Sequence, residues 1–148
     1  VCLERGAARV YAVDVGRGQL HPKVAGDPRV VSLEATDARD LTTALIPEPP
    51  DLIVTDVSFI SLAKALPAAL SLAAPAADLV ALVKPQFEVG PERVGKGGLV
   101  ADPTARQDAL DDVCGFLDAS GWTVLATDHS PIEGGDGNRE FLVWANQA

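Results

Sequence analysis

The stretch "TVLATDHSPIEGGDGNREFLVWA", residues 123–145, decides the topology of the fold. It contains two strand-like runs, 123–129 and 140–145, which are rich in β-branched and aromatic residues. The ten residues between them hold turn-forming residues and no helical pattern. Because strands joined without a helix pair antiparallel, the two runs predict a terminal hairpin.

Upstream of this hairpin, strand-like and helix-like segments alternate, which predicts an α/β fold with a mostly parallel sheet. The clearest helix follows Asp102, a plausible N-cap, with Pro103 at its first position and Gly121 closing it. A second helix is predicted over 59–74, with Pro67 forcing a kink or a restart. The remaining strand-like runs are 9–15, 29–35, 51–57 and 78–84.

This order of elements resembles the Rossmann-like fold of S-adenosylmethionine-dependent methyltransferases, a fold analogy that does not by itself give a function. The opening residues, "VCLERG" at 1–6, are typical of the last turns of a helix closed by a glycine. No strand and no glycine-rich loop come before them. We therefore expect the chain to begin inside the fold.

The composition indicates one compact domain, with 47% hydrophobic and 22% charged residues in 148. The net charge of −9 opposes nucleic acid, so another region must help if the chain acts on RNA. Cys2 and Cys114 lack metal-type spacing and are expected to be buried, reduced thiols. The most apolar stretch, 65–77, is too short to span a membrane. We expect a cytoplasmic protein without a membrane role.

Acidic residues close several strands, and ligands of open α/β sheets bind outside the carboxyl ends of the strands. Asp14 and Asp37 are expected to hold a nucleoside, Asp14 by accepting its ribose hydroxyls and Asp37 beside its base. Val15 and Gly16 would complete the contact, because glycine lets the backbone turn close to a ligand. The alternative is that both acids are ordinary turn or N-cap residues.

Three further charged residues should meet at one rim of the sheet. Asp56 ends the run 51–57 and Lys84 ends the run 78–84, so their side chains lie next to each other if the strands are parallel neighbours. Glu140 begins the last strand, which runs antiparallel, so its start lies on the same rim. The alternative to a catalytic site is a salt-bridge cluster that ties the strand ends together.

A family resemblance rests on five segments of the chain: "RGAARVYAVDVGRGQL", "PPDLIVTDVSFISL", "LVALVKPQFEVG", "VGKGGLV" and "GNREFLVW". They resemble the methyltransferase domain of the hemolysin A family, the FtsJ-like ribosomal RNA 2′-O-methyltransferases. The resemblance implies S-adenosyl-L-methionine as cofactor, cytidine ribose in rRNA as substrate, and a Lys-Asp-Lys-Glu tetrad. Asp56, Lys84 and Glu140 match its last three members, with Asp56 also near the ammonium of the cofactor.

The resemblance also implies what this chain lacks. Family members carry a small RNA-binding domain, the first tetrad lysine and a glycine-rich cofactor loop on the first strand. We therefore expect residues 1–148 to be a methyltransferase domain without its first strand and cofactor loop, inactive alone. Its unpaired sheet edges would invite pairing with a second copy.

In the implied mechanism, Lys84 orients or deprotonates the ribose 2′-hydroxyl while Asp56 and Glu140 hold the lysine. The segment 85–102 reads as a long loop with Arg93 and Lys96, which we expect to face RNA as a lid; a plain solvated loop is the alternative. Arg139 is a third expected RNA contact.

Other functions remain open at this stage. Methylation of an amino group is the nearest rival, although the prolines of its usual motif are absent from "DVSF" at 56–59. A nicotinamide oxidoreductase would need a glycine fingerprint that the chain lacks. A non-catalytic or cytolytic hemolysin-type protein is the alternative from another class, and lysis would require a membrane-active segment.

Overall fold

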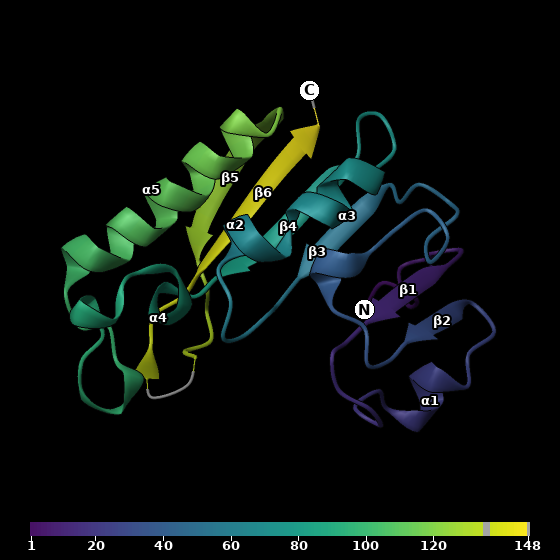
Figure 1. Ribbon diagram of the computed structural model, residues 1–148, viewed down its shortest axis with the longest axis horizontal. Coiled ribbons are helices and arrows are strands. Elements are labelled where there is room, and N and C mark those ends of the chain that lie inside the picture. The colour runs from purple at the N-terminus through teal and green to yellow at the C-terminus, as the bar shows by residue number, and fades with distance from the viewer. Residues whose placement is uncertain (135–136, 148) are drawn as a thin grey trace. The chain divides into compact units, whose positions relative to one another are not determined.

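The computed structural model describes residues 1–134 and 137–147 and divides into two compact units, residues 1–48 and 49–148 (Figure 1). Each unit has its own β-sheet. The sequence prediction of one methyltransferase domain over 1–148 stays a prediction.

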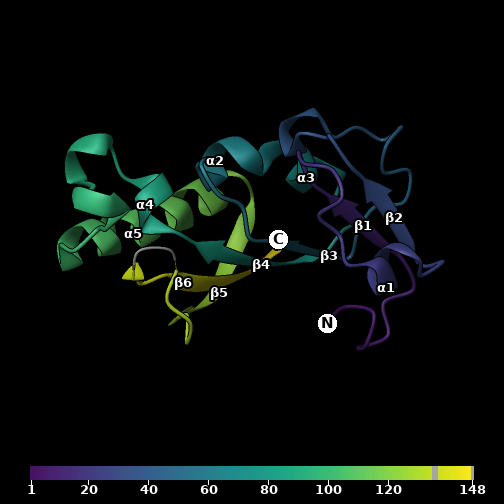
Figure 2. The same ribbon diagram turned by 90° about the horizontal axis from the view of Figure 1, so that it is seen from below.

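The first unit is built on two parallel strands, β1 (Val10–Val13) and β2 (Val30–Leu33). Between them lies the short helix α1 (Pro22–Ala25), which packs beside β2 (Figure 2). The 3-10 turn η1 (Ala38–Asp40) follows β2. Residues 1–6 form a helical turn that ends at Gly6 with φ of 93°, the closing conformation predicted for this glycine.

The second unit contains a four-stranded sheet in the order β3-β4-β6-β5. Its strands are β3 (Leu52–Thr55), β4 (Asp78–Val83), β5 (Trp122–His129) and β6 (Phe141–Gln147). β3 and β4 are parallel, whereas β6 runs antiparallel to both β4 and β5. The predicted terminal hairpin and α/β class are confirmed. The strand pairing of the described residues is mixed, with parallel pairs β1–β2 and β3–β4 and antiparallel pairs β4–β6 and β5–β6.

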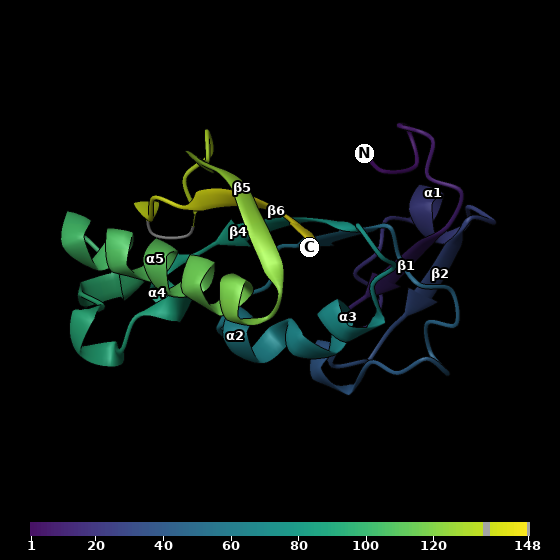
Figure 3. The same ribbon diagram turned by 90° about the horizontal axis from the view of Figure 1, so that it is seen from above.

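Helices α2 (Leu62–Ala65), α3 (Pro67–Leu72) and α5 (Pro103–Ala119) lie on one side of this sheet (Figure 3). Side chains alternate between the two faces of β4, and the set that faces these helices, Leu79, Ala81 and Val83, is fully buried. The helices therefore cover the apolar face of the sheet. The core between helices and sheet is made of Leu62, Leu66, Leu79, Ala81, Val83, Leu110, Val113, Leu117 and Val143.

The opposite face of the four-stranded sheet is exposed among the described residues. Val54 is the register partner of Val80, and Val80 is the partner of Trp144, so three strands contribute one apolar row. Their exposed fractions are 57%, 37% and 46%. β3 and β4 carry apolar residues on both faces, a pattern typical of strands that are covered on both sides. In the structure only the face toward the helices is buried.

Two local predictions are corrected by the structure. The helix expected over 59–74 begins only at Leu62, because Phe59 adopts a left-handed φ of 65°, and it ends at Leu72. Its restart at Pro67 is as predicted. The segment 85–102 is not a plain loop. It forms α4 (Pro85–Glu88) and the 3-10 turns η2 (Pro91–Arg93) and η3 (Lys96–Gly98), the first two opened by prolines at a position where a missing N–H costs nothing.

Cys2 and Cys114 are free, as predicted, but each is half-buried rather than buried. Burial raises the pKa of the Cys114 thiol, and Asp111 and Asp118 on the same helix raise it further. Among the described residues, no helix is long and apolar enough to cross a bilayer.

Helix α5 begins where the sequence predicts. The Asp102 carboxylate accepts a hydrogen bond from the backbone N–H of Thr104 at 3.0 Å, which satisfies one of the free donors of the first turn.

We expect Asp102→Ala to lower the free energy of unfolding of the chain by about 1 kcal/mol, because that donor loses its partner. Urea unfolding followed by circular dichroism measures the change. Asp118→Ala, which removes a carboxylate from the last turn of the same helix, is the matched control and should leave stability unchanged or slightly raised. Equal losses in both variants would contradict the capping role.

Candidate active site

The core of the candidate site is an ion pair at the carboxyl ends of β3 and β4. The Lys84 ammonium lies 2.6 Å from Oδ1 of Asp56 and donates to Oγ of Ser58 at 3.2 Å. The parallel register of the two strands brings these residues together, as the sequence predicts. The lysine side chain is only 14% exposed and that of Asp56 is 68% exposed. The ammonium is therefore partly enclosed, while the carboxylate remains open to a ligand.

Glu140 reaches the same rim from the antiparallel strand. β6 pairs Phe141 with Val83, so the residue before Phe141 lies beside the residue after Val83, which is Lys84. The Glu140 side chain is 5% exposed and accepts a hydrogen bond from Nε2 of Gln86 at 3.1 Å. Among the described ion pairs, Lys84 is paired with Asp56 and not with Glu140. Glu140 is thus held by Gln86 rather than by the lysine.

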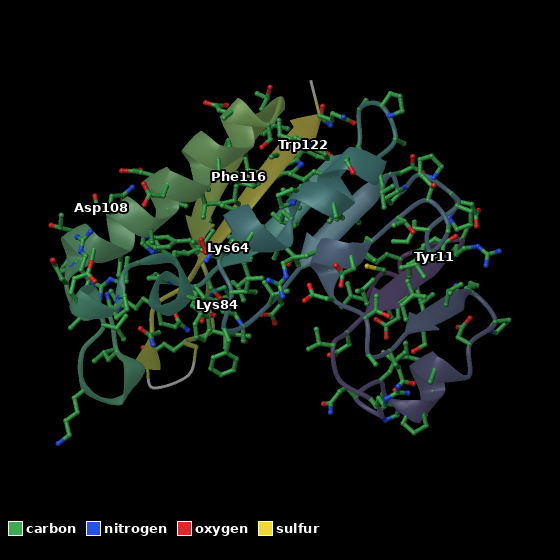
Figure 4. All side chains as sticks on the ribbon, viewed as in Figure 1. Tyr11, Lys64, Lys84, Asp108, Phe116 and Trp122 are labelled. Atoms are coloured by element: carbon green, nitrogen blue, oxygen red, sulfur yellow. The ribbon has the colours of Figure 1, made fainter. Side chains whose placement is uncertain are left out.

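A pocket of about 660 Å³ joins these groups. Lys84, labelled in Figure 4, lies where this pocket meets the end of β4. The convergence of three charges distant in sequence is therefore present in the structure. The lining includes Asp56, Ser58, Phe59, Lys84, Phe87 and Glu140.

Sequence reasoning missed several residues of this pocket. Ser58 and Gln86 each bind one of the predicted charges, and neither belongs to a pattern that marks it. Phe59 is 89% exposed, and its ring lies 4.9 Å from that of Phe87, centroid to centroid. The available signal was an aromatic residue in each of the short segments that follow Asp56 and Lys84.

In the first unit, Asp14 directly follows β1, as predicted, and its Oδ1 accepts the backbone N–H of Gly16 at 2.9 Å. Both residues line a pocket of about 160 Å³, and Val15 between them is 71% exposed. A Cβ on Gly16 would lie 3.1 Å from Cγ of Gln19, which is tighter than ordinary contact. This tight contact is with the chain's own Gln19, so the predicted approach of the Gly16 backbone to a ligand stays a prediction.

The predicted position of Asp37 at a strand end is wrong. β2 stops at Leu33, and Ala35 takes a left-handed φ of 48°, so Glu34 occupies the strand end instead. Glu34 lines the Asp14 pocket and accepts the N–H of Gly18 at 2.6 Å. Asp37 caps η1 four residues after the strand, which is the turn role weighed against nucleoside binding.

Asp37 also forms an ion pair with Arg39, with 2.6 Å between Oδ2 and Nη2. Hydrogen bonds from the Arg39 side chain and backbone lower the pKa of the Asp37 carboxyl to about 2. Any ligand contact by Asp37 would therefore share the carboxylate with this guanidinium.

The three residues expected at RNA lie in different environments. Arg93 is paired with Asp108 of α5 at 2.9 Å, whereas Lys96 and Arg139 are exposed. The segment around Lys96 is anchored by Asn138, which is 1% exposed, donates to the Gly98 carbonyl at 2.8 Å and accepts from the Val100 N–H at 2.9 Å.

A protein-family model described as "FtsJ-like methyltransferase" matches residues 1–147. The chain belongs to this family. This match agrees with the family resemblance and the fold class predicted from the sequence.

The sequences of individual relatives support the same family assignment. The chain is 49% identical over 144 residues to the 16S/23S rRNA (cytidine-2'-O)-methyltransferase TlyA of Mycobacterium tuberculosis, covering 97% of this chain and 54% of TlyA. It is 39% identical to Hemolysin A of Brachyspira hyodysenteriae, covering 95% of this chain and 59% of that protein. The chain spans about half the length of the curated relatives it matches.

Among solved structures, one described as a putative hemolysin from Streptococcus thermophilus aligns with a TM-score of 0.94 and 41% identity. The alignment covers 99% of this chain and 53% of that one. The FtsJ-like fold is therefore shared over almost the whole chain.

The Asp37–Arg39 pair makes a prediction for this FtsJ-like domain. We expect Arg39→Gln to raise the pKa of Asp37 from about 2 toward its ordinary value of 3.8, because the guanidinium that stabilises the carboxylate is lost. Carboxyl NMR shifts recorded across the acid range measure it. Because the folded-state pKa is depressed, the pair stabilises the fold above pH 3.8, and this contribution is lost as the pH falls toward 2.

Asp27 is the internal control. Its pKa is also lowered to about 2, by Arg29, and it should not move in Arg39→Gln. A shift of both carboxyls would point to a global change of the unit instead of a local pair.

Proposed function

We propose that this chain supplies the catalytic domain of an enzyme that transfers a methyl group from S-adenosyl-L-methionine to a ribose 2′-oxygen of ribosomal RNA, with cytidine as the nucleoside. The observation that carries the proposal is the Lys84–Asp56 ion pair at 2.6 Å, in one pocket with Glu140. The rRNA (cytidine-2'-O)-methyltransferase activity for which TlyA, a relative at 49% identity, is named supports the same reaction and substrate.

Lys84 would act on the attacking hydroxyl. An ammonium has three N–H donors, and two of them point to Asp56 and Ser58, which leaves one for a ligand in the pocket. An ammonium donates hydrogen bonds and accepts none, so in this role Lys84 orients the 2′-oxygen and stabilises the negative charge that develops there. The methyl group would pass from the cofactor sulfur to that oxygen, and the hydroxyl proton would pass to solvent water in the pocket. This favours orientation over general-base catalysis, the two roles that the sequence leaves open.

The residues proposed to hold the cofactor are Asp14, Val15, Gly16, Asp37 and Asp56. Asp14 uses one oxygen for the Gly16 N–H, and its second oxygen can accept a ribose hydroxyl. Asp56 has an exposed carboxylate suited to the ammonium of the methionine moiety. When bound, the cofactor supplies an electrophilic methyl group. In the first unit the free oxygen of Asp14 fits a ribose hydroxyl, and in the second unit the open carboxylate of Asp56 fits an ammonium group.

RNA binding would use Lys96 and Arg139, the exposed cations among the three predicted contacts, with Arg93 restrained by Asp108. The exposed ring of Phe59 in the pocket is suited to stacking on an unpaired base. Since the net charge is −9, phosphate binding by this chain is weak, and the intact protein needs further basic surface. A ribosomal substrate would also place the enzyme in the cytoplasm.

The rival functions explain fewer of these contacts. Methylation of an amino group needs no ammonium beside the acceptor, and a nicotinamide oxidoreductase gives Lys84 and Glu140 no role. Lysis, which the hemolysin names of some relatives imply for those proteins, gives no role to any of the pocket charges.

We expect Lys84→Met in the intact protein to lower the methyl-transfer rate by about a hundredfold or more, because the group that orients the hydroxyl is lost. The dissociation constant of S-adenosyl-L-methionine should change little. Single-turnover transfer of tritiated methyl groups to ribosomal RNA, together with calorimetry, measures both. Lys64→Met, an exposed lysine on α2, is the control, and turnover retained by the Lys84 variant would refute the assignment.

Lys96→Glu should weaken RNA binding by a few-fold and reduce the salt dependence of the affinity by about one ion, because one phosphate contact becomes repulsive. Filter binding of an rRNA fragment at several salt concentrations measures it. The matched charge reversal is Lys23→Glu on α1, which should have a smaller effect. Identical losses in both variants would mean that net charge, and not a contact at Lys96, governs binding.

A further inference from the structure

Two short segments of the second unit carry the groups of the Lys84 cluster. We name residues 56–61, which follow β3, the Asp56 loop, and residues 84–88, which follow β4, the Lys84 segment. Three contacts already described join them, namely Asp56 to Lys84, Ser58 to Lys84, and Phe59 to Phe87. All three lie at the pocket.

A fourth contact joins Glu88, the last residue of the Lys84 segment, to Leu62, the residue directly after the Asp56 loop. The backbone N–H of Leu62, the first residue of α2, donates to the Glu88 carboxylate at 3.0 Å to Oε2 and 3.3 Å to Oε1. Leu62 is 2% exposed, and the side chain of the N-cap Ser61 makes no capping hydrogen bond. Glu88 therefore satisfies a buried N–H that the helix itself cannot satisfy.

The carboxylate is held there at an electrostatic cost. The pKa of Glu88 is raised to about 7, mainly by burial and further by the Asp112 carboxylate on α5, although the hydrogen bond from the Leu62 N–H lowers it. Glu88 thus interacts with the backbone N–H of Leu62 on α2 and with the carboxylate of Asp112 on α5. The buried carboxylate thus carries a desolvation cost while it satisfies the Leu62 N–H, so apolar packing does not account for a glutamate at this position.

We propose that Glu88 is a positioning residue, which fixes the Asp56 loop so that Asp56 and Ser58 meet the Lys84 ammonium. The loop is tied to the Lys84 segment at both ends, by Lys84 at its start and by Glu88 just beyond its end. The catalytic role of the Lys84 cluster rests on the proposed function. The hydrogen bond between the Leu62 N–H and Glu88, which we call the tie, does not depend on it.

The sign of the pH effect follows from the raised pKa. Between the ordinary glutamate value of 4.5 and about 7, the folded protein binds the proton that the unfolded chain has released. Stability contributed by Glu88 is therefore present below pH 4.5, falls as the pH rises to about 7, and is constant above it. The contribution of Glu88 to the free energy of unfolding should be larger at pH 4.5 than at pH 8.

The first experiment tests the tie without activity. In the 148-residue chain, NMR titration should show the Glu88 carboxyl and the Leu62 amide proton changing together with a midpoint near pH 7. Glu88→Gln should abolish the Leu62 transition. Glu92→Gln, which alters an exposed carboxylate on η2, should leave it intact. A Leu62 amide that does not respond between pH 5 and 8.5, or a Glu88 midpoint near 4.5, overturns the proposal.

The second experiment tests positioning in the intact protein. Glu88→Met removes the acceptor of the Leu62 N–H and should lower the single-turnover methyl-transfer rate at least about tenfold, with cofactor affinity nearly unchanged. Glu88→Gln retains an acceptor oxygen and should keep the rate within a few-fold of the parent. A merely structural residue would not lower the transfer rate while leaving cofactor affinity intact and allowing rescue by glutamine.

The two proposals can fail separately. If the parent protein methylates RNA and Glu88→Met retains the full rate, or if Glu88→Gln is as slow as Glu88→Met, the positioning role is refuted. If the Leu62 transition is present but the parent protein transfers no methyl group to RNA, the proposed function fails and the tie stands.

Discussion

Strand β4 is hydrogen-bonded along both edges, parallel to β3 and antiparallel to β6, and the candidate site depends on that arrangement. The parallel edge brings two strand ends side by side, and the antiparallel edge brings a strand start to the same rim. An acid, an amine and a second acid, spread over 85 positions of the chain from Asp56 to Glu140, thereby reach one pocket. The chemistry of the pocket is thus a product of sheet order.

Much of this arrangement can be predicted from the sequence, because it depends on patterns that extend over several residues. Alternation and β-branched runs locate each strand of the described residues to within two residues at each end, and an Asp-Pro start with a glycine stop locates α5. Once β3 and β4 are recognised as parallel neighbours, the pairing of Asp56 with Lys84 follows from strand spacing. The convergence of the three charges on one pocket can therefore be predicted from strand order, without knowledge of side-chain contacts.

The rest depends on single residues in conformations that their type does not signal. Ala35 and Phe59 adopt positive φ values, which end β2 early and delay α2, and neither is a glycine or an asparagine. Side-chain partners are likewise decided by local turns. Gln86 faces Glu140 only because Pro85 opens a helical turn directly after Lys84. Such choices arise from tertiary contacts, so periodicity does not reveal them.

The position of the Glu140 carboxylate also depends on the backbone at Gly134. A Cβ at this position would overlap the Glu140 carboxylate, although the glycine has no positive φ that would demand it. The main chain itself therefore forms part of the wall that confines the acid. Sequence variation at position 134 is limited by the room Glu140 requires, and an alanine there would move the carboxylate away from Gln86 before it disturbed any strand.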